Sequence, residues 1–247
     1  MTTTKRCKFT ILIAALVIYP LTVFAEPVTI NWWHAHGGRL GEKVNAIAED
    51  FNKSQSDYKL VATYKGNYTD TMTAGIAAFR AKSPPHILQV FEVGTATMMA
   101  AKGAINPVYE VMAESGLPFD PGVYLPTVTG YYTTPDGKML SMPFNSSTPV
   151  LYYNKEMFKK AGLDPDSPPK TWPEVAAAAE KMIQAGVCEA GFSTAWISWI
   201  HLENFSAWHN IPFGTKANGF GGMDARYSFN SPTHVKHIGM LADWQKN

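Results

Sequence analysis

The sequence predicts an α/β fold, in which a mostly parallel β-sheet is covered by helices. Segments rich in β-branched and aromatic residues alternate with segments whose apolar residues recur every three to four positions. The 247 residues are 46% hydrophobic and 17% charged, which is the composition of a globular protein. This alternation of strand and helix is typical of chains that build a parallel sheet with helices on its faces.

The first 25 residues have the pattern of a secretory signal peptide. Three basic residues, Lys5, Arg6 and Lys8, precede an apolar run over residues 9–25. Val23 and Ala25 suit the −3 and −1 positions of a cleavage site. We expect cleavage after Ala25 rather than a membrane anchor, because the run is near the lower length limit for a span and Pro20 interrupts it.

Charge and cysteine content limit the possible partners. Lys and Arg number 21 against 20 Asp and Glu, and removal of the three basic leader residues would leave a net charge of −2. This balance argues against an electrostatic nucleic-acid binder. Cys188 would be the only cysteine left after cleavage. In an oxidising compartment it is either a small buried hydrophobe or a thiol whose partner lies outside this chain.

Strands and helices are expected to alternate up to residue 101. The strands are expected over 28–33, 59–64 and 86–91, and helices over 70–81 and 95–101. Between the first two strands, spacing near 3.6 predicts another helix. Its inward face is expected to carry Leu40, Val44, Ile47 and Phe51.

The later part of the chain changes pattern. A hairpin is expected around residues 135–137, and an aromatic strand over 148–154. Thr171 and Glu174 predict a capping box at the start of a helix that runs to about residue 184. Two further helices are expected, over 199–208 and from Ser231 onward. The apolar face of the last one would carry Val235, Ile238, Leu241 and Trp244.

Polar segments follow the predicted strands at the end where open α/β sheets bind their ligands. The candidate segments are residues 34–38, 65–68, 92–94 and 145–148, and one that carries Trp196 and Trp199. Hydroxyls, one carboxylate and flat rings suit a small polyhydroxy ligand. Carboxylates accept hydrogen bonds from its hydroxyls, and rings cover its C–H faces.

Nucleotide and metal chemistry have weak support. Gly37 and Gly38 open a helix, but the Gly-Lys-Ser/Thr ending of a nucleotide loop is missing, so ordinary turn glycines are favoured. The histidine pairs at 34/36 and 234/237 come with neither cysteines nor a nearby carboxylate pair. We therefore predict no metal site and no cofactor.

Glu92 and the two tryptophans each have two interpretations. Glu92 can serve as the general acid of a secreted hydrolase, but no second carboxylate is obviously paired with it, and no Gly-x-Ser-x-Gly motif is present. Trp196 and Trp199 are three residues apart and suit a core as well as a ligand platform.

One segment in the middle of the chain resembles the signature of a known family. It runs through Leu151-Tyr152-Tyr153-Asn154-Lys155, Phe158, Ala161-Gly162-Leu163, Pro168-Pro169, Thr171-Trp172 and Glu174. It resembles the extracellular solute-binding proteins of ABC importers, in the branch that includes maltose-binding protein. Further segments at 64–80, 92–100, 143–149 and 202–208 are similar to the periplasmic members that bind sn-glycerol 3-phosphate.

The resemblance implies a periplasmic-binding-protein-like fold of type II, with two α/β lobes that close over the ligand. The positions that match ligand contacts are Tyr68 and Glu92 in the first lobe, Ser147 near the crossover with Ser146 as a rival, and Trp196 and Trp199 in the second lobe. In these roles Glu92 would accept from glycerol hydroxyls. Tyr68 and Ser147 would donate to phosphate or hydroxyl oxygens, and the rings would cover the carbon chain.

The implied organisation is a signal peptide over 1–25, a first lobe over 26–147, and the crossover with a partial second lobe over 148–247. Chains of this family are much longer, so we expect the second lobe to be incomplete. The resemblance also suggests that Cys188 pairs with a cysteine in the part that this chain lacks.

The implied role is a periplasmic binding component, not an enzyme. It would act as a monomer, with sn-glycerol 3-phosphate and the permease subunits as partners and without nucleic acid. A sugar- or polyol-binding relative and a non-functional truncated fragment are the alternatives.

Overall fold

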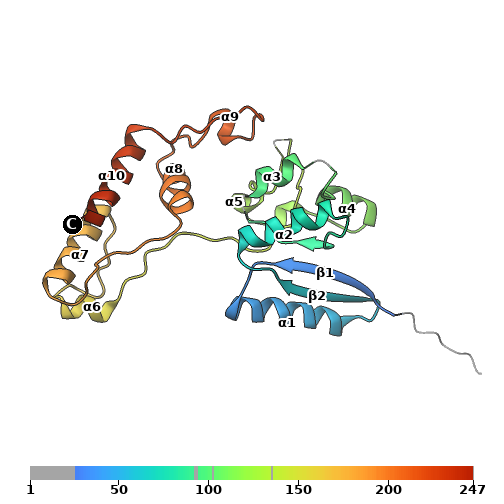
Figure 1. Ribbon diagram of the computed structural model, residues 1–247, viewed down its shortest axis with the longest axis horizontal. Coiled ribbons are helices and arrows are strands. Elements are labelled where there is room, and N and C mark those ends of the chain that lie inside the picture. The colour runs from blue at the N-terminus through green and yellow to red at the C-terminus, as the bar shows by residue number, and fades with distance from the viewer. Residues whose placement is uncertain (1–25, 92–93, 102, 135, 247) are drawn as a thin grey trace, which may run out of the picture. The chain divides into compact units, whose positions relative to one another are not determined.

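The computed structural model describes residues 26–91, 94–101, 103–134 and 136–246 (Figure 1). The chain forms two compact units, one ending at Phe91 and one beginning at residue 92. The predicted signal peptide lies outside the described residues. The predicted lobe boundary after residue 147 is a different division of the chain and stays a prediction. No helix in the described part combines the length and the apolar character that a membrane crossing needs.

The first unit contains a three-stranded parallel sheet with the order β2-β1-β3. β1 (Val28–His34) pairs along its whole length with β2 (Tyr58–Tyr64). On its other side, Trp32 and Trp33 pair with β3 (Ile87–Leu88). The predicted α/β fold with a parallel sheet is confirmed, although β3 is shorter than the segment predicted for it.

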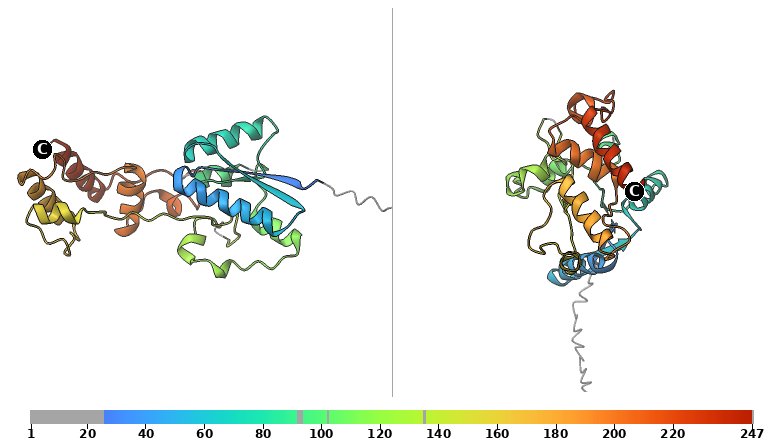
Figure 2. Two further views of the ribbon diagram at one scale, coloured as in Figure 1. Left: turned by 90° about the horizontal axis from the view of Figure 1, so that it is seen from below. Right: turned by 90° about the vertical axis from the view of Figure 1, so that its left-hand side faces the viewer.

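Helices α1 (Gly38–Ser54) and α2 (Tyr68–Arg80) connect the strands and lie on opposite sides of the sheet (Figure 1). Figure 2 shows the same unit from below, with α1 in front of the strands. The Asn52 side chain joins α1 to the edge strand: it donates to the Leu60 carbonyl at 2.9 Å and accepts from the Leu60 amide at 2.7 Å. These bonds satisfy backbone groups of β2 on the side where no strand of the described residues pairs with it.

The predicted inward face of α1 is wrong except at Val44. The helix buries Gly41, Val44 and Ala48, whereas Leu40 and Ile47 are 62% and 50% exposed. A Cβ on Gly41 would lie 2.7 Å from the His36 carbonyl oxygen. His36 lies in the segment that leads into α1, so Gly41 has no room for a side chain against this segment, and the larger apolar side chains of the helix turn outward.

The second unit consists of helices joined by irregular segments, and none of its described residues forms a named strand. Its helical elements are α3 (Thr95–Ala100), α4 (Val108–Ser115), η2 (Pro121–Val123), α5 (Pro126–Thr129), α6 (Lys155–Lys160), α7 (Trp172–Gln184), η3 (Ser198–Asn204), α8 (Phe205–Trp208), α9 (Thr215–Asn218) and α10 (Pro232–Lys246).

Both β predictions for the second unit differ from the structure. The predicted hairpin is reduced to one antiparallel bridge between Thr133 and Met139. The strand predicted over 148–154 is irregular and leads into Asn154, whose side chain caps α6. A β-rich sequence forms a strand only where a neighbour completes its hydrogen bonds, and the described residues supply none here.

Helices α6 and α7 pack around a small apolar core, formed by Phe158, Ala161, Ala178 and Met182. Cys188 is a free thiol that packs against this core. The predicted capping box of α7 is confirmed: the Thr171 hydroxyl accepts from the Glu174 amide, and the Glu174 carboxylate accepts from the Thr171 amide. Hydrogen bonds from the Lys170 and Thr171 amides hold the Glu174 pKa below its usual range.

The predicted apolar face of α10 is wrong at Val235, which is 58% exposed. The most buried residues of the helix are instead His234 and His237. Their rings pack against Phe205, with centroids 5.9 and 4.0 Å away. Imidazole rings are flat and partly apolar, so they fill a place that the sequence pattern assigns to aliphatic side chains.

Candidate ligand-binding site

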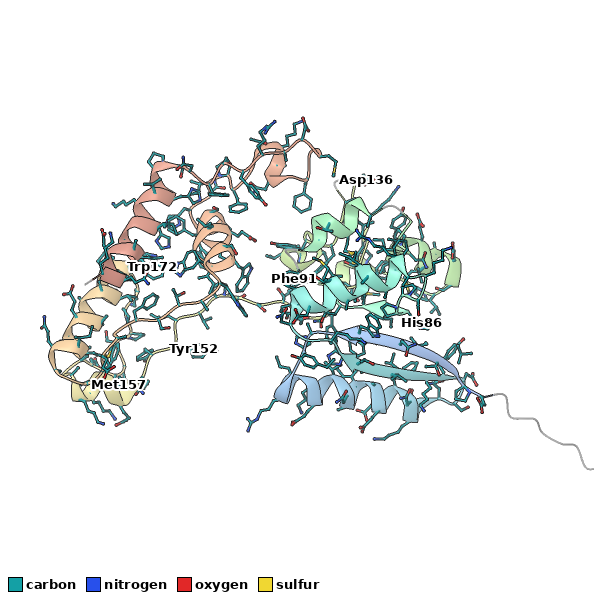
Figure 3. The ribbon with its side chains drawn as sticks, viewed as in Figure 1. His86, Phe91, Asp136, Tyr152, Met157 and Trp172 are labelled. Carbon is teal, nitrogen blue, oxygen red and sulfur yellow. The ribbon has the colours of Figure 1, made fainter. Side chains whose placement is uncertain are left out.

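The carboxyl ends of the three strands meet at one edge of the first unit, as the sequence predicts. The Lys65 amide donates to the His34 carbonyl at 3.0 Å, and the Gln89 amide donates to the β1 backbone at 2.9 Å. Figure 3 places Phe91 at this edge and His86 at the opposite edge of the sheet. Segments far apart in the sequence therefore form one surface here.

The start of α2 places Tyr68 at this edge. The Asn67 side chain accepts from the Asp70 amide at 3.0 Å, and the Asp70 carboxylate accepts from the Asn67 amide at 3.2 Å. Tyr68 is the first residue of the helix, and its ring stacks on Phe91, with centroids 5.5 Å apart and 8° between the planes. Aromatic pairs contribute about 0.5–1.5 kcal/mol beyond burial, so this contact orients the Tyr68 ring.

His36 and Gln89 complete the edge; His36 lies in a candidate segment of the sequence analysis, whereas Gln89 lies in none. The His36 ring lies edge-on to Tyr68, with centroids 6.0 Å apart. The Gln89 carboxamide accepts from the Ala35 amide at 2.9 Å and lies 2.8 Å from His36 Nε2. Gln89 lies within a predicted strand and His36 within a predicted polar segment, so only the folded structure brings them together.

His34 lies beneath this surface and is 2% exposed. Its Nδ1 accepts from the His36 amide at 3.4 Å, and its Nε2 has no hydrogen-bond partner among the described residues. Burial, with a smaller influence from His36, lowers the pKa of His34. A hollow of about 400 Å³ adjoins it, lined by His34, Gly37, Glu42 and Tyr64 among others, but not by Tyr68. His34 therefore supports the edge as a neutral side chain.

The tryptophan pair of the second unit is also brought together. The rings of Trp196 and Trp199 lie edge to face, with centroids 6.0 Å apart. Trp196 has a φ of +51° and is 67% exposed, while Trp199 is half-buried at the start of η3. The Ile200 amide donates to the Trp196 carbonyl at 2.9 Å. A pair with one exposed ring and one half-buried ring suits a ligand platform more than a core.

The remaining predicted contacts are Ser147, with Ser146 as its rival, and Glu92. Ser146 and Ser147 are exposed in an irregular segment, so the choice between them stays open. Glu92 lies outside the described residues, directly after Phe91. Among the described residues, no group of three or more His, Cys, Asp or Glu side chains gathers in a way that could hold a metal ion.

The chemistry of the first unit's edge favours a polar, anionic ligand. Tyr68 offers a hydroxyl, and His36 and Gln89 offer ring and amide nitrogens. The Lys65 ammonium lies 3.9 Å from the centre of the Trp33 ring and adds a positive charge to the segment that precedes Tyr68. These groups can bind hydroxyls and oxyanions.

The fold is that of a solute-binding protein. The chain matches the cyclic alpha-maltosyl-1,6-maltose binding protein from Arthrobacter globiformis with a TM-score of 0.60 and 21% identity, over 89% of this chain and 55% of that one. It matches a periplasmic oligogalacturonide binding protein from Yersinia enterocolitica with a TM-score of 0.63 and 18% identity, over 89% and 51%. These likenesses confirm the predicted fold class.

The chain belongs to the bacterial extracellular solute-binding protein family, whose profile matches residues 35–247. It is 54% identical over 218 residues to the sn-glycerol-3-phosphate-binding periplasmic protein UgpB of Brucella abortus (strain 2308), which covers 88% of this chain and 50% of the relative. The protein of the same name from Rhizobium meliloti (strain 1021) is 48% identical over 95% and 55%. That from Yersinia pestis bv. Antiqua (strain Antiqua) is 54% identical over 97% and 54%.

The chain spans about half the length of the curated relatives that it matches. Family membership confirms the predicted resemblance, and the periplasmic relatives confirm the predicted location.

Proposed function

We propose that the chain is the periplasmic solute-binding component of an ABC importer and that it binds sn-glycerol 3-phosphate. The observation that carries this proposal is 48–54% identity, over 88–97% of the chain, to proteins named for that ligand. Binding would close two lobes over the ligand, as hinged binding proteins do, and the closed form would deliver it to the permease. The proposal extends to glycerophosphodiesters, which share the glycerol phosphate group.

The proposed ligand contacts are Tyr68, Glu92, Ser147, Trp196 and Trp199. The Tyr68 hydroxyl would donate to a phosphate or hydroxyl oxygen, and Glu92 would accept from glycerol hydroxyls. The two tryptophan rings would cover the carbon chain and exclude water. The polar edge around Tyr68 and the contact between the two tryptophan rings support these assignments, each within its own unit.

The proposal includes a monomer that catalyses no reaction and binds no nucleic acid. The relatives are solute-binding proteins, and the whole chain has a net charge of only +1. A secreted hydrolase that uses Glu92 is the alternative from another class. It would release phosphate or glycerol from the ligand, whereas a binding protein would return the ligand unchanged.

Replacing Tyr68 with phenylalanine tests the proposed site. The variant keeps the ring that stacks on Phe91 and loses only the hydroxyl. A hydrogen bond to a charged group contributes about 1.5–3 kcal/mol, so we expect affinity for sn-glycerol 3-phosphate to fall on the order of tenfold or more. Calorimetric titration measures it. The matched control is Tyr58→Phe, at an exposed residue that begins β2. Equal affinities for wild type, variant and control would refute the role of Tyr68.

A further inference from the structure

Three buried histidines gather where η3, α8 and α10 meet in the second unit. They are His201, His234 and His237, which are 1%, 1% and 4% exposed. His201 Nδ1 lies 3.0 Å from His237 Nε2, and His201 Nε2 lies 2.7 Å from the Thr194 hydroxyl. A chain of hydrogen bonds therefore joins the segment before η3, η3 itself and α10.

Aromatic rings enclose the His201–His237 pair. Phe205 stacks on His237, with centroids 4.0 Å apart and 10° between the planes. Trp172 lies 5.1 Å from the His237 ring and 5.7 Å from the His201 ring. Figure 3 shows Trp172 at the start of α7, beside α10. Apolar ring surfaces therefore pack around the pair, and they solvate a positive charge far less well than water does.

The same hydrogen bonds hold the segment that carries both tryptophans. Thr194 precedes Trp196 by two residues, and His201 follows Trp199 by two. The bond between the Thr194 hydroxyl and His201 therefore closes a loop around them. Trp196 occupies the left-handed region, with a φ of +51°, a conformation that persists in a non-glycine residue only where its surroundings hold it.

We propose that His201 and His237 form a pH-sensitive positioning pair: in the neutral form it holds the Trp196–Trp199 segment in place for ligand, and protonation of both rings releases the segment and weakens binding. This inference rests on the proposed function. A neutral pair places one N–H between His201 Nδ1 and His237 Nε2. Two protonated rings would place two N–H groups against each other across the same 3.0 Å, which breaks the chain of bonds.

The surroundings favour the neutral form. Burial lowers the pKa of His201, and burial with the nearby His201, His209 and His234 lowers the pKa of His237 to about 4. No carboxylate of the described residues contributes to either shift. At the start of α7, the Glu174 carboxylate is occupied by backbone amides, and His234 on α10 is bonded to the hydroxyls of Ser206 and Ser231.

The direction of the pH effect follows from these lowered pKa values. In the unfolded or released segment the histidines have the ordinary pKa of about 6.5, whereas in the folded pair their pKa values are lower. The stabilisation of the held segment by the neutral histidine pair is therefore complete above about pH 6.5 and is lost as the pH falls toward about 4. Over this pH window, proton uptake by the two histidines is coupled to release of the segment that carries Trp196 and Trp199.

The test compares wild type with His201→Gln and with the double variant His201→Gln/His237→Gln. Glutamine can form hydrogen bonds but does not titrate in this range. The control His86→Gln removes a histidine of the first unit, whose ring nitrogen accepts from the Asn31 amide. Affinity for sn-glycerol 3-phosphate is measured by calorimetry at about pH 7.5 and about pH 5. Because the ligand phosphate also titrates, the proteins are compared with one another at each pH.

We expect the wild type and His86→Gln to lose at least about fivefold more affinity at the lower pH than the double variant loses. In the ligand-free proteins, amide hydrogen exchange of residues 194–204, corrected for intrinsic rates, should rise at the lower pH in the wild type and not in the double variant. Circular dichroism checks folding, and His201→Gln alone replaces the double variant if that one unfolds.

Two results would overturn the inference. One is the same pH dependence of affinity in the wild type and the glutamine variants. The other is an amide exchange rate over residues 194–204 of the wild type that, after correction for intrinsic rates, does not change with pH. If none of the proteins binds the ligand at about pH 7.5, the proposed function is refuted. The exchange measurement on the ligand-free proteins then still tests whether the histidine pair holds residues 194–204 in a pH-dependent way.

Discussion

Replacing Gly191 with alanine is expected to destabilise the second unit strongly. A Cβ at this position would lie 2.5 Å from the Ala179 Cβ, 2.6 Å from its Cα and 2.7 Å from its carbonyl oxygen. Two of these atoms belong to the backbone of α7, which cannot rotate away. The segment before η3 must then separate from the helix, and overpacking of this kind costs about 1–3 kcal/mol, occasionally more.

Urea or thermal unfolding of the second unit measures this effect. The matched control is Gly239→Ala, because a Cβ at Gly239, inside α10, would meet none of the described residues outside the backbone of its own helix within 4 Å. Alanine in an exposed helix interior is favoured over glycine by about 1 kcal/mol, so the control should be neutral or stabilised. A Gly191→Ala protein as stable as wild type would show that this loop does not pack on α7 as described.

Replacing Trp196 with alanine is expected to reduce ligand affinity strongly while leaving the fold intact. The ring is 67% exposed, so its removal opens no large cavity in the core. If it covers the carbon chain of the ligand, its loss removes an apolar contact of about 1.5–3 kcal/mol, or roughly tenfold to a hundredfold in affinity. Its partner ring, Trp199, also loses its neighbour 6.0 Å away.

The control for this prediction is Trp208→Ala, which removes another tryptophan of the second unit, 81% exposed on α8. Titration with sn-glycerol 3-phosphate should separate the two variants, because Trp208 is not among the proposed contacts. If both variants bind as the wild type does, the pair is a surface feature and not a ligand platform.

Local patterns predicted the elements whose shape depends on local chemistry. The strands β1 and β2, the helices α1 and α2 and the capping box of α7 all lie close to their predicted ranges. The helix faces were less predictable. α1 buries Gly41 and Ala48, and α10 buries two histidines, because both choices depend on which neighbour the helix meets.

The candidate site was predictable only in part. The rule that ligands bind beyond the carboxyl ends of strands located the segment around Tyr68. The contacts of His36 with Gln89 and of His201 with His237 join residues 53 and 36 positions apart, and no local pattern records them. The spacing of His234 and His237 on one helix face was visible in the sequence, but it did not indicate their packing against Phe205.

The central claim, that this chain binds sn-glycerol 3-phosphate, is tested most directly by calorimetric titration of the wild-type protein with that ligand, glycerol and maltose. Circular dichroism first establishes that the protein is folded. We expect saturable binding of sn-glycerol 3-phosphate, weaker binding of glycerol because it lacks the phosphate, and no binding of maltose. A folded protein that binds maltose instead, or none of the three, would contradict the claim.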